Sequence, residues 1–95
     1  MIVLVRFEVG GEDADRFLAR ASRQAADSLA LEPACRRFDV ATHPDDIRQI
    51  LLYEIYDSAA DFEAHLRTEH FLQFDRDVAE MVETKTVEIW NGPRV

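Results

Sequence analysis

Two histidines, His65 and His70, stand five residues apart and are the side chains of this chain best suited to proton chemistry. The unperturbed pKa of histidine lies closest to neutrality, so two histidines near one cavity indicate proton transfer or binding of a polar ligand. On one continuous helix they would point about 140° apart. A helix break near Thr68 would let both face one cavity, as a base and an orienting donor. The alternative is one cavity histidine and one histidine on the helix surface.

This spacing does not indicate a metal site. Two histidines on one helix chelate a metal when they are four residues apart, and His65 and His70 are five apart. The sequence also has no hydrolase triad, P-loop or dinucleotide-binding fingerprint. We therefore expect no bound metal and no flavin or other cofactor.

Glu54 is the third candidate for proton transfer. It lies between Leu52 and Tyr56 in a strongly β-forming segment. A carboxylate in such surroundings should have a raised pKa, or else pair with Arg6 or Arg37. Its role would be that of a general base or of an orienting partner for a histidine. A purely structural ion pair is the alternative.

Polar and aromatic side chains near His65, His70 and Glu54 would bind the substrate. Arg6, Arg37 and Asp39 are the polar candidates, although strand ends often reach solvent. Aromatic walls for a planar ligand would come from Tyr56, Phe71 and Trp90. For these aromatic residues the alternative is plain packing.

Periodicity and turn residues predict an α+β fold with the ferredoxin-like order βαββαβ. Strands are expected at residues 2–9, 34–41, 47–56 and 84–91, and a long helix at 12–29 with an apolar stripe of Phe17, Leu18, Ala21, Ala25 and Leu29. Ser58 should cap a short helix, because Asp61 follows three residues later. Thr68 should begin another helix, whose apolar stripe is Phe71, Phe74, Val78, Met81 and Val82.

Alternation along the strands predicts two different faces of the sheet. The face beneath the helices should be apolar and carry Val3, Val5, Phe7, Val9, Phe38, Val40, Leu51, Tyr53, Ile55, Val87 and Ile89. The second face should mix apolar with ionisable residues: Ile2, Leu4, Arg6, Glu8, Arg37, Asp39, Ile50, Leu52, Glu54, Tyr56, Glu88 and Trp90. Such a patch favours an interface. We expect two sheets to pack face to face in a homodimer around a lined cavity; a solvated sheet is the alternative.

Length and composition indicate one domain over residues 1–95, with 47% apolar and 32% charged residues. The net charge of −8 argues against nucleic acid or an anionic membrane as partner. The single cysteine, Cys35, excludes an intrachain disulfide and is expected to be buried. Neither a signal peptide nor an apolar run of about 20 residues is found, so we expect a cytoplasmic protein.

Four sequence pieces together resemble the antibiotic biosynthesis monooxygenase (ABM) domain family, and the resemblance covers nearly the whole chain. The pieces are Glu32-Pro33-Ala34-Cys35, Arg37-Phe38-Asp39-Val40, Tyr53-Glu54-Ile55-Tyr56 and Phe62-x-x-His65-x4-His70-Phe71. The chain departs from the family pattern at Ala34, where glycine is common, and at Glu69, where proline often precedes the second histidine. His65 stands where the haem-degrading relatives have a tryptophan, which argues against haem.

The resemblance implies a dimeric α/β barrel with one pocket per subunit. It also implies a cofactor-independent monooxygenase, an oxidoreductase that acts with O₂ on a small phenolic or quinol-like substrate. A subgroup similar in these pieces includes the isomerase of phosphorylated autoinducer-2, so isomerisation of a small phosphorylated hydroxyketone is the first alternative. Its phosphate would need a cation, for which Arg6, Arg37, Arg67 and Lys85 are candidates. A non-catalytic small-molecule binding module is the second alternative.

Overall fold

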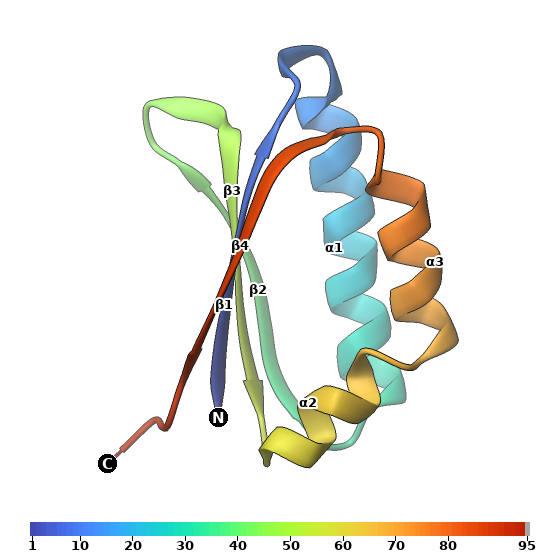
Figure 1. The fold of residues 1–95 in the computed structure, drawn as a ribbon, viewed down its shortest axis with the longest axis vertical. Helices are drawn as coiled ribbons and strands as arrows, with labels where there is room; N and C mark the ends of the chain where they lie inside the picture. The colour runs from blue at the N-terminus through green and yellow to red at the C-terminus, as the bar shows by residue number, and fades with distance from the viewer. Residues whose placement is uncertain (95) are drawn as a thin grey trace.

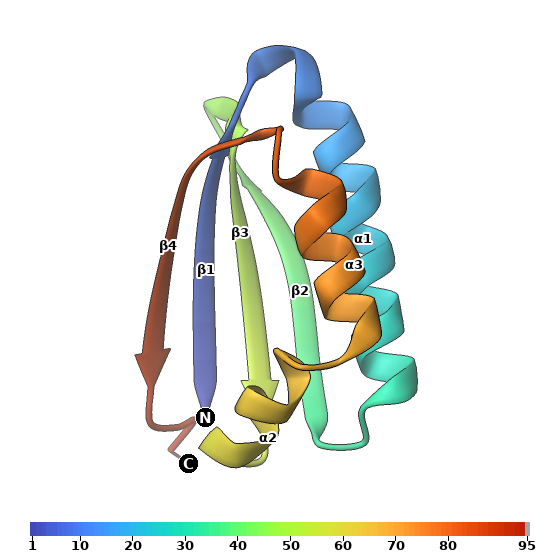
Figure 2. The same ribbon diagram turned by 45° about the vertical axis from the view of Figure 1, so that its right-hand side comes forward.

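The computed structural model describes residues 1–94 and contains a four-stranded antiparallel sheet in the order β2-β3-β1-β4. The chain runs β1 (Ile2–Val9), a short 3₁₀ helix η1 (Gly11–Asp13), α1 (Ala14–Leu31), β2 (Cys35–His43), β3 (Asp46–Tyr56), α2 (Ala59–His65), α3 (Glu69–Val78) and β4 (Val82–Trp90). This is the predicted ferredoxin-like α+β order, with the second helical region divided in two. Figures 1 and 2 show the helices gathered on one face of the sheet.

Local signals placed the starts of α2 and α3 correctly, whereas α1 begins at Ala14 rather than at the predicted residue 12. The Ser58 hydroxyl accepts a hydrogen bond from the N–H of Asp61, and the Thr68 hydroxyl accepts one from the N–H of Phe71. These N-caps satisfy N–H groups that the first turn of a helix leaves without a partner. The end of the last helix was predicted too late: α3 stops at Val78, so Met81 lies beyond the helix and Val82 begins β4.

The side chains of β3 face the opposite way from the prediction. Val3 is paired with Glu54 and Val5 with Leu52, and paired residues share a face of the sheet. The residues of β3 that point toward the helices are therefore Ile50, Leu52, Glu54 and Tyr56, all of them buried. The open face instead receives Leu51, Tyr53 and Ile55. The predicted assignment was wrong because both faces of β3 are apolar, so the alternation did not fix the register.

The core lies between the sheet and the long helix α1. Phe17 and Ala21 of α1 are fully buried, and Ala25 is nearly so, as predicted. Leu29 was expected in the same stripe, but it is 48% exposed. The buried stripe near the end of α1 passes through Gln24 and Ser28 instead, and the Ser28 hydroxyl donates a hydrogen bond to the Gln24 carbonyl. Two polar side chains thus lie where the helix meets the sheet.

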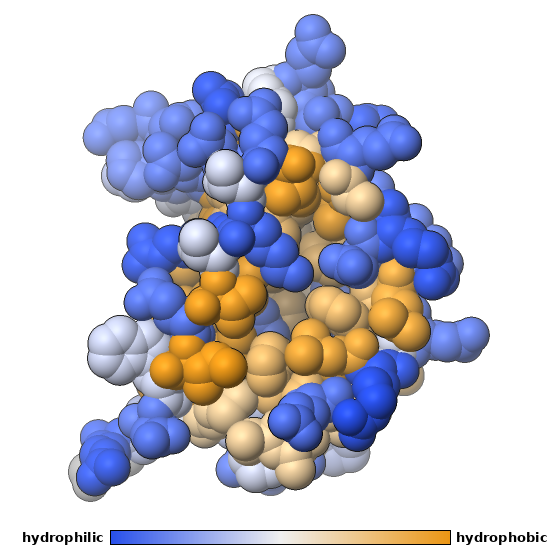
Figure 3. Space-filling model, in the orientation of Figure 1, coloured by the Kyte–Doolittle hydropathy of each residue, from blue (hydrophilic) through white to orange (hydrophobic). Residues whose placement is uncertain are grey.

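The helix layer does not extend over β4. Val87 and Ile89 lie on the helix-facing side of that strand, as predicted, yet they are 48% and 56% exposed. Figure 3 shows apolar surface over β4 and, across a hollow, over α2 and α3. An opening therefore exists between the last strand and the two short helices. None of the helices in residues 1–94 combines the length and apolarity needed to cross a membrane.

Candidate functional site

The break between α2 and α3 brings His65 and His70 together. His65 is the last residue of α2, and α3 begins at Glu69. Thr68 holds the break: its hydroxyl donates to the carbonyl of His65 and accepts from the N–H of Phe71. The two imidazole ring centroids lie 5.7 Å apart. The predicted break is confirmed, and it removes the 140° separation that a continuous helix would impose.

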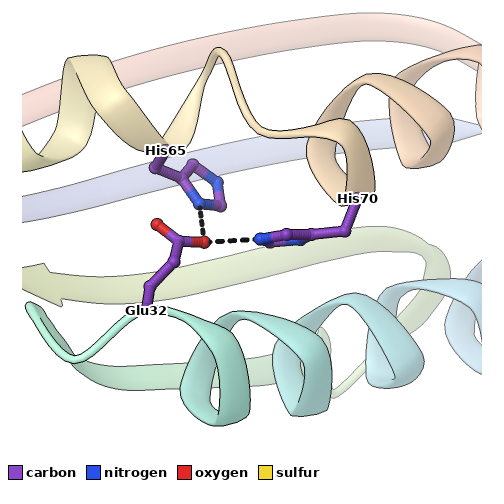
Figure 4. A group of neighbouring side chains, drawn as sticks. All are labelled: Glu32, His65 and His70. Atoms are coloured by element: carbon purple, nitrogen blue, oxygen red, sulfur yellow. Dashed lines mark hydrogen bonds and ion pairs between the residues drawn. The ribbon is translucent and has the colours of Figure 1, made fainter.

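Glu32 contacts both histidines with one carboxylate oxygen. Its Oε2 lies 2.7 Å from Nδ1 of His65 and 2.7 Å from Nε2 of His70 (Figure 4). Glu32 is the residue that ends α1, immediately before Pro33, a residue type that cannot continue a helix. From the sequence, Glu32 was noted only as part of the family resemblance, and its contact with the histidines was not predicted. The one feature of the sequence that could have pointed to Glu32 is its position directly before Pro33, where the helix must end and the main chain must turn.

The carboxylate selects one tautomer of His65. Nδ1 hydrogen bonds to Glu32, so it carries the ring proton and leaves the Nε2 lone pair available. His65 is only 2% exposed, and burial lowers its pKa, although the interaction with Glu32 acts in the opposite direction. The ring is therefore neutral near pH 7. A neutral imidazole with an available nitrogen is a competent proton acceptor.

A small cavity of about 40 Å³ lies between the sheet and the helices, beside His65. Its polar lining consists of Gln24, Glu54, His65 and Lys85. The apolar lining residues are Val5, Phe7, Phe38, Leu52, Phe62, Leu66, Phe71, Phe74 and Val87. A water needs about 10–15 Å³ of such space, so the cavity has room for only a few waters. An aromatic ligand could enter only if side chains at the opening moved, and Leu66 and Val87 are partly exposed there.

Glu54 is buried on the cavity side of β3. It is 3% exposed, and the Tyr56 hydroxyl donates a 2.6 Å hydrogen bond to its Oε1. Burial raises the pKa of Glu54 to about 7, although the hydrogen bond from Tyr56 opposes this shift. The raised pKa expected from sequence is found. The alternative pairing with Arg6 or Arg37 does not occur, because both are bound elsewhere.

Four of the predicted substrate-binding residues lie on the open face of the sheet. Arg6 pairs with Glu88 at 3.2 Å, and Arg37 pairs with Asp39 at 2.6 Å. Trp90 is 57% exposed and lies opposite Ile2 on the same face. The structure therefore does not bring these four side chains to the cavity at His65.

The two other aromatic candidates do lie near that cavity. Phe71 lines it, and its ring centroid is 5.2 Å from that of His65. Tyr56 packs against His65 at the same centroid distance.

Sequence reasoning missed Gln24, which enters the cavity from α1 and whose amide nitrogen lies 3.0 Å from Nδ1 of His70. A polar residue within the buried stripe of α1 was the available signal.

The chain belongs to the family described as antibiotic biosynthesis monooxygenase (ABM), whose family model matches residues 1–77. The matched region includes Glu32, both histidines and Glu54. No curated protein matches this chain.

Solved structures agree with this assignment. A structure from Nitrosomonas europaea, named for the same family, is 28% identical with a TM-score of 0.90 and 96% coverage of both chains. A structure from Bacteroides thetaiotaomicron, also named for the family, is 22% identical with a TM-score of 0.90 and covers 100% of this chain and 90% of that one. A third, from Deinococcus radiodurans, is 15% identical with a TM-score of 0.89 and covers 99% and 93%. The last two support the fold alone.

Proposed function

We propose that this protein is a cofactor-independent monooxygenase that acts on a small phenolic or quinol-like substrate. The observation that carries the proposal is the Glu32–His65 pair, which leaves Nε2 of a neutral, buried imidazole available beside an aromatic-lined cavity. Family membership supports the oxygenase class. The residues that line the cavity support an aromatic substrate.

His65 acts as the base in this proposal. Its Nε2 takes the proton of the substrate hydroxyl, and Glu32 stabilises the imidazolium that forms. The electron-rich anion then reacts with O₂. One oxygen atom replaces a hydrogen on a ring carbon and becomes the carbonyl oxygen of a quinone, and the other leaves as water. The substrate loses two hydrogens overall and supplies every electron, so no external reductant is needed.

Glu54 is the second proton-handling group in the proposal. Its pKa near 7 lets it exchange a proton with the bound substrate or with the departing water. Lys85, which also lines the cavity, supplies a positive charge that favours the substrate anion. The mostly apolar walls exclude water, which strengthens these charge interactions.

A homodimer formed through the open face of the sheet is part of the same proposal. That face carries a group of apolar side chains, Ile2, Leu4, Leu51, Tyr53, Ile55 and Trp90, which no helix covers among the described residues. Ion pairs such as Arg37–Asp39 flank them. An apolar centre with a charged rim is typical of a protein interface. In this arrangement the cavity lies within each subunit rather than between the two sheets.

Isomerisation of a small phosphorylated hydroxyketone is the second candidate, and one observation favours it. Of the four cations considered for phosphate binding, Lys85 lines the cavity together with Glu54, a carboxylate suited to an enediol route. Lys85→Met should then abolish saturable binding of a phosphorylated hydroxyketone. Under the oxygenase proposal it should weaken oxidation of a quinol only partly.

The experiment that tests the main proposal follows O₂ uptake by metal-stripped protein with a panel of quinols and phenols. The wild-type chain should accelerate uptake, and His65→Gln should reduce kcat by about 10²-fold or more. His43→Gln is the matched control, because His43 is exposed at the end of β2 and does not line the cavity at His65. Equal rates for wild type and His65→Gln would overturn the proposal. A bound small molecule without turnover would indicate a binding module.

A further inference from the structure

We infer that Glu32, His65 and His70 also form a binding site for one divalent transition-metal ion of the Zn²⁺ type. Ligand atoms from these three side chains lie within 4.8 Å of one another. Two of the distances, from Glu32 Oε2 to the two ring nitrogens, are 2.7 Å. Zinc bonds of about 2.0–2.2 Å to nitrogen and oxygen require ligand atoms about 3.3 Å apart. Small side-chain rotations would therefore open this cluster to the required size.

Two buried polar atoms at this cluster have no hydrogen-bond partner among the described residues. Nε2 of His70 is buried and has no hydrogen-bond partner among the described residues, although the carboxylate of Glu32 is close to it. Oε1 of Gln24 is likewise buried without a partner within residues 1–94. Buried polar atoms without a partner are rare and point to a missing water or ion.

Rotation of the Gln24 amide by 180° prepares Nε2 of His70 for a metal, and it places the amide nitrogen where Oε1 now lies without a partner. The amide oxygen then takes the position 3.0 Å from Nδ1 of His70 and accepts its N–H. The lone pair of His70 moves to Nε2, which faces Oε2 of Glu32. Two electron-rich atoms 2.7 Å apart repel each other unless a cation lies between them. A metal-bound histidine ordinarily donates its other N–H in this way.

The ligand set determines the class of ion. Two imidazoles and one carboxylate suit Zn²⁺, Co²⁺ or Fe²⁺, whereas Mg²⁺ and Ca²⁺ prefer oxygen ligands alone. The three side chains come from the end of α1, the end of α2 and the start of α3, so the packing of these helices holds them. Three protein ligands leave at least one coordination position open, which a water could occupy.

Metal binding here would act against the proposed base. A metal on Nδ1 of His65 displaces the proton that Glu32 now holds there, and the neutral ring then carries its proton on Nε2. That nitrogen can no longer accept a proton from a substrate. Zn²⁺ should therefore inhibit the oxygenase reaction, a consequence that depends on the proposed function, whereas metal binding itself does not.

Equilibrium dialysis of the metal-free protein against Zn²⁺, without substrate, tests the inference. One ion per chain is expected for wild type and for His43→Ala. Loss of a ligand in Glu32→Gln or His70→Ala should weaken binding by about 100-fold or more, and loss of the supporting amide in Gln24→Met by about 10–100-fold. Zn²⁺ binding that is equal in all variants would overturn the inference, and so would no binding by wild type.

A measurement on wild type avoids any fold defect of the variants. Paramagnetic Co²⁺ should broaden the ring proton signals of His65 and His70 and leave those of His43 unchanged. Broadening of His43 alone would contradict the inference. Binding without quinol-dependent O₂ uptake would reject the proposed function and retain the metal site. O₂ uptake that depends on His65, without metal binding, would reject the metal site and retain the proposed function.

Discussion

The Tyr56 hydroxyl donates a 2.6 Å hydrogen bond to Oε1 of Glu54, and both side chains are buried on the same face of β3. The bond stabilises the carboxylate, but burial opposes it more strongly and raises the pKa of Glu54 from 4.5 to about 7. Burial and the negative charge of Glu54 also raise the pKa of Tyr56, so its hydroxyl keeps its proton at neutral pH. The Glu54 carboxyl group can therefore exchange a proton with solvent or substrate near neutral pH, while Tyr56 fixes the orientation of that carboxyl group.

Glu54 should make the stability of the protein depend on pH. An acid whose pKa is higher in the folded than in the unfolded state stabilises the fold at low pH, below the pKa of the unfolded state. This contribution is lost as the pH rises through the pKa of the folded state. Glu54 should therefore reduce the free energy of unfolding by about 3 kcal/mol between pH 4.5 and pH 7. Urea unfolding of wild type and Glu54→Gln at pH 5 and pH 8 measures this, because glutamine still accepts the Tyr56 hydrogen bond.

The difference between the two proteins isolates the contribution of this one carboxylate. Glu54→Gln should be more stable than wild type at pH 8, and the gain should shrink at pH 5. Glu63→Gln, on the exposed surface of α2, is the matched control and should change neither value by more than about 0.5 kcal/mol. Parallel pH curves for wild type and Glu54→Gln would contradict the raised pKa.

Glu32→Gln should lower kcat more than it changes KM. Glu32 does not line the cavity, so it acts on substrate only through His65. A glutamine amide can present either its NH₂ or its oxygen to Nδ1, and the ring is no longer held in one tautomer. We expect kcat to fall by at least about 10-fold. This loss should be smaller than the loss of about 10²–10⁴-fold expected when the base, His65, is removed. Steady-state kinetics in metal-free buffer measures both constants, and a change confined to KM would exclude this positioning role.

A charge placed on the open face should dissociate the proposed dimer. Leu4→Glu puts a carboxylate among the apolar residues of that face, and a buried charge without a partner costs about 3–5 kcal/mol. The dimer dissociation constant should rise by at least about 100-fold, as measured by sedimentation equilibrium. Ile89→Glu adds the same charge at an exposed apolar residue on the helix-facing side of β4 and should leave the assembly unchanged. A wild-type monomer would contradict the dimer.

Thr68→Ala should reduce both stability and activity. The Thr68 hydroxyl caps α3 and also holds the carbonyl of His65, so its loss loosens the turn between the two histidines. An N-cap of this type contributes about 1 kcal/mol. Thr68→Ser retains the hydroxyl and should restore most of the unfolding free energy and of kcat. Ser58→Ala removes a comparable cap at the far end of α2 and should cost stability with a smaller effect on kcat. Equal kcat values for Thr68→Ala and wild type would show that the turn does not position the histidines.

The family resemblance and the order of elements were both available from the sequence. β1 was predicted with its correct bounds. The cap at Ser58 was predicted from its spacing to Asp61, and the cap at Thr68 from a polar residue before a helical segment. The break at Thr68 also correctly suggested that His65 and His70 could approach one another. Each of these features depends on residues within a few positions of one another, so a local pattern is sufficient to reveal it.

The position of the cavity could not be predicted, because the sequence pattern of β3 allows either register. Ile50 and Leu52 alternate with Leu51 and Ile55, so apolar side chains occupy both faces, and a shift of one residue exchanges the faces. The pairing of Val3 with Glu54 decides that Glu54 and Tyr56 face the helices. The same pairing separates them from Arg37, Asp39 and Trp90, which sequence reasoning had placed beside them.

The sequence by itself therefore determined the chemical repertoire of this protein: two histidines at a helix break, an acid in an apolar strand and an ABM-type fold around them. Only the tertiary structure decided which acid meets the histidines. Glu32 lies 33 residues before His65, and no local pattern links them. The contact exists because α1 ends where α2 gives way to α3, and that meeting depends on how the helices pack on the sheet.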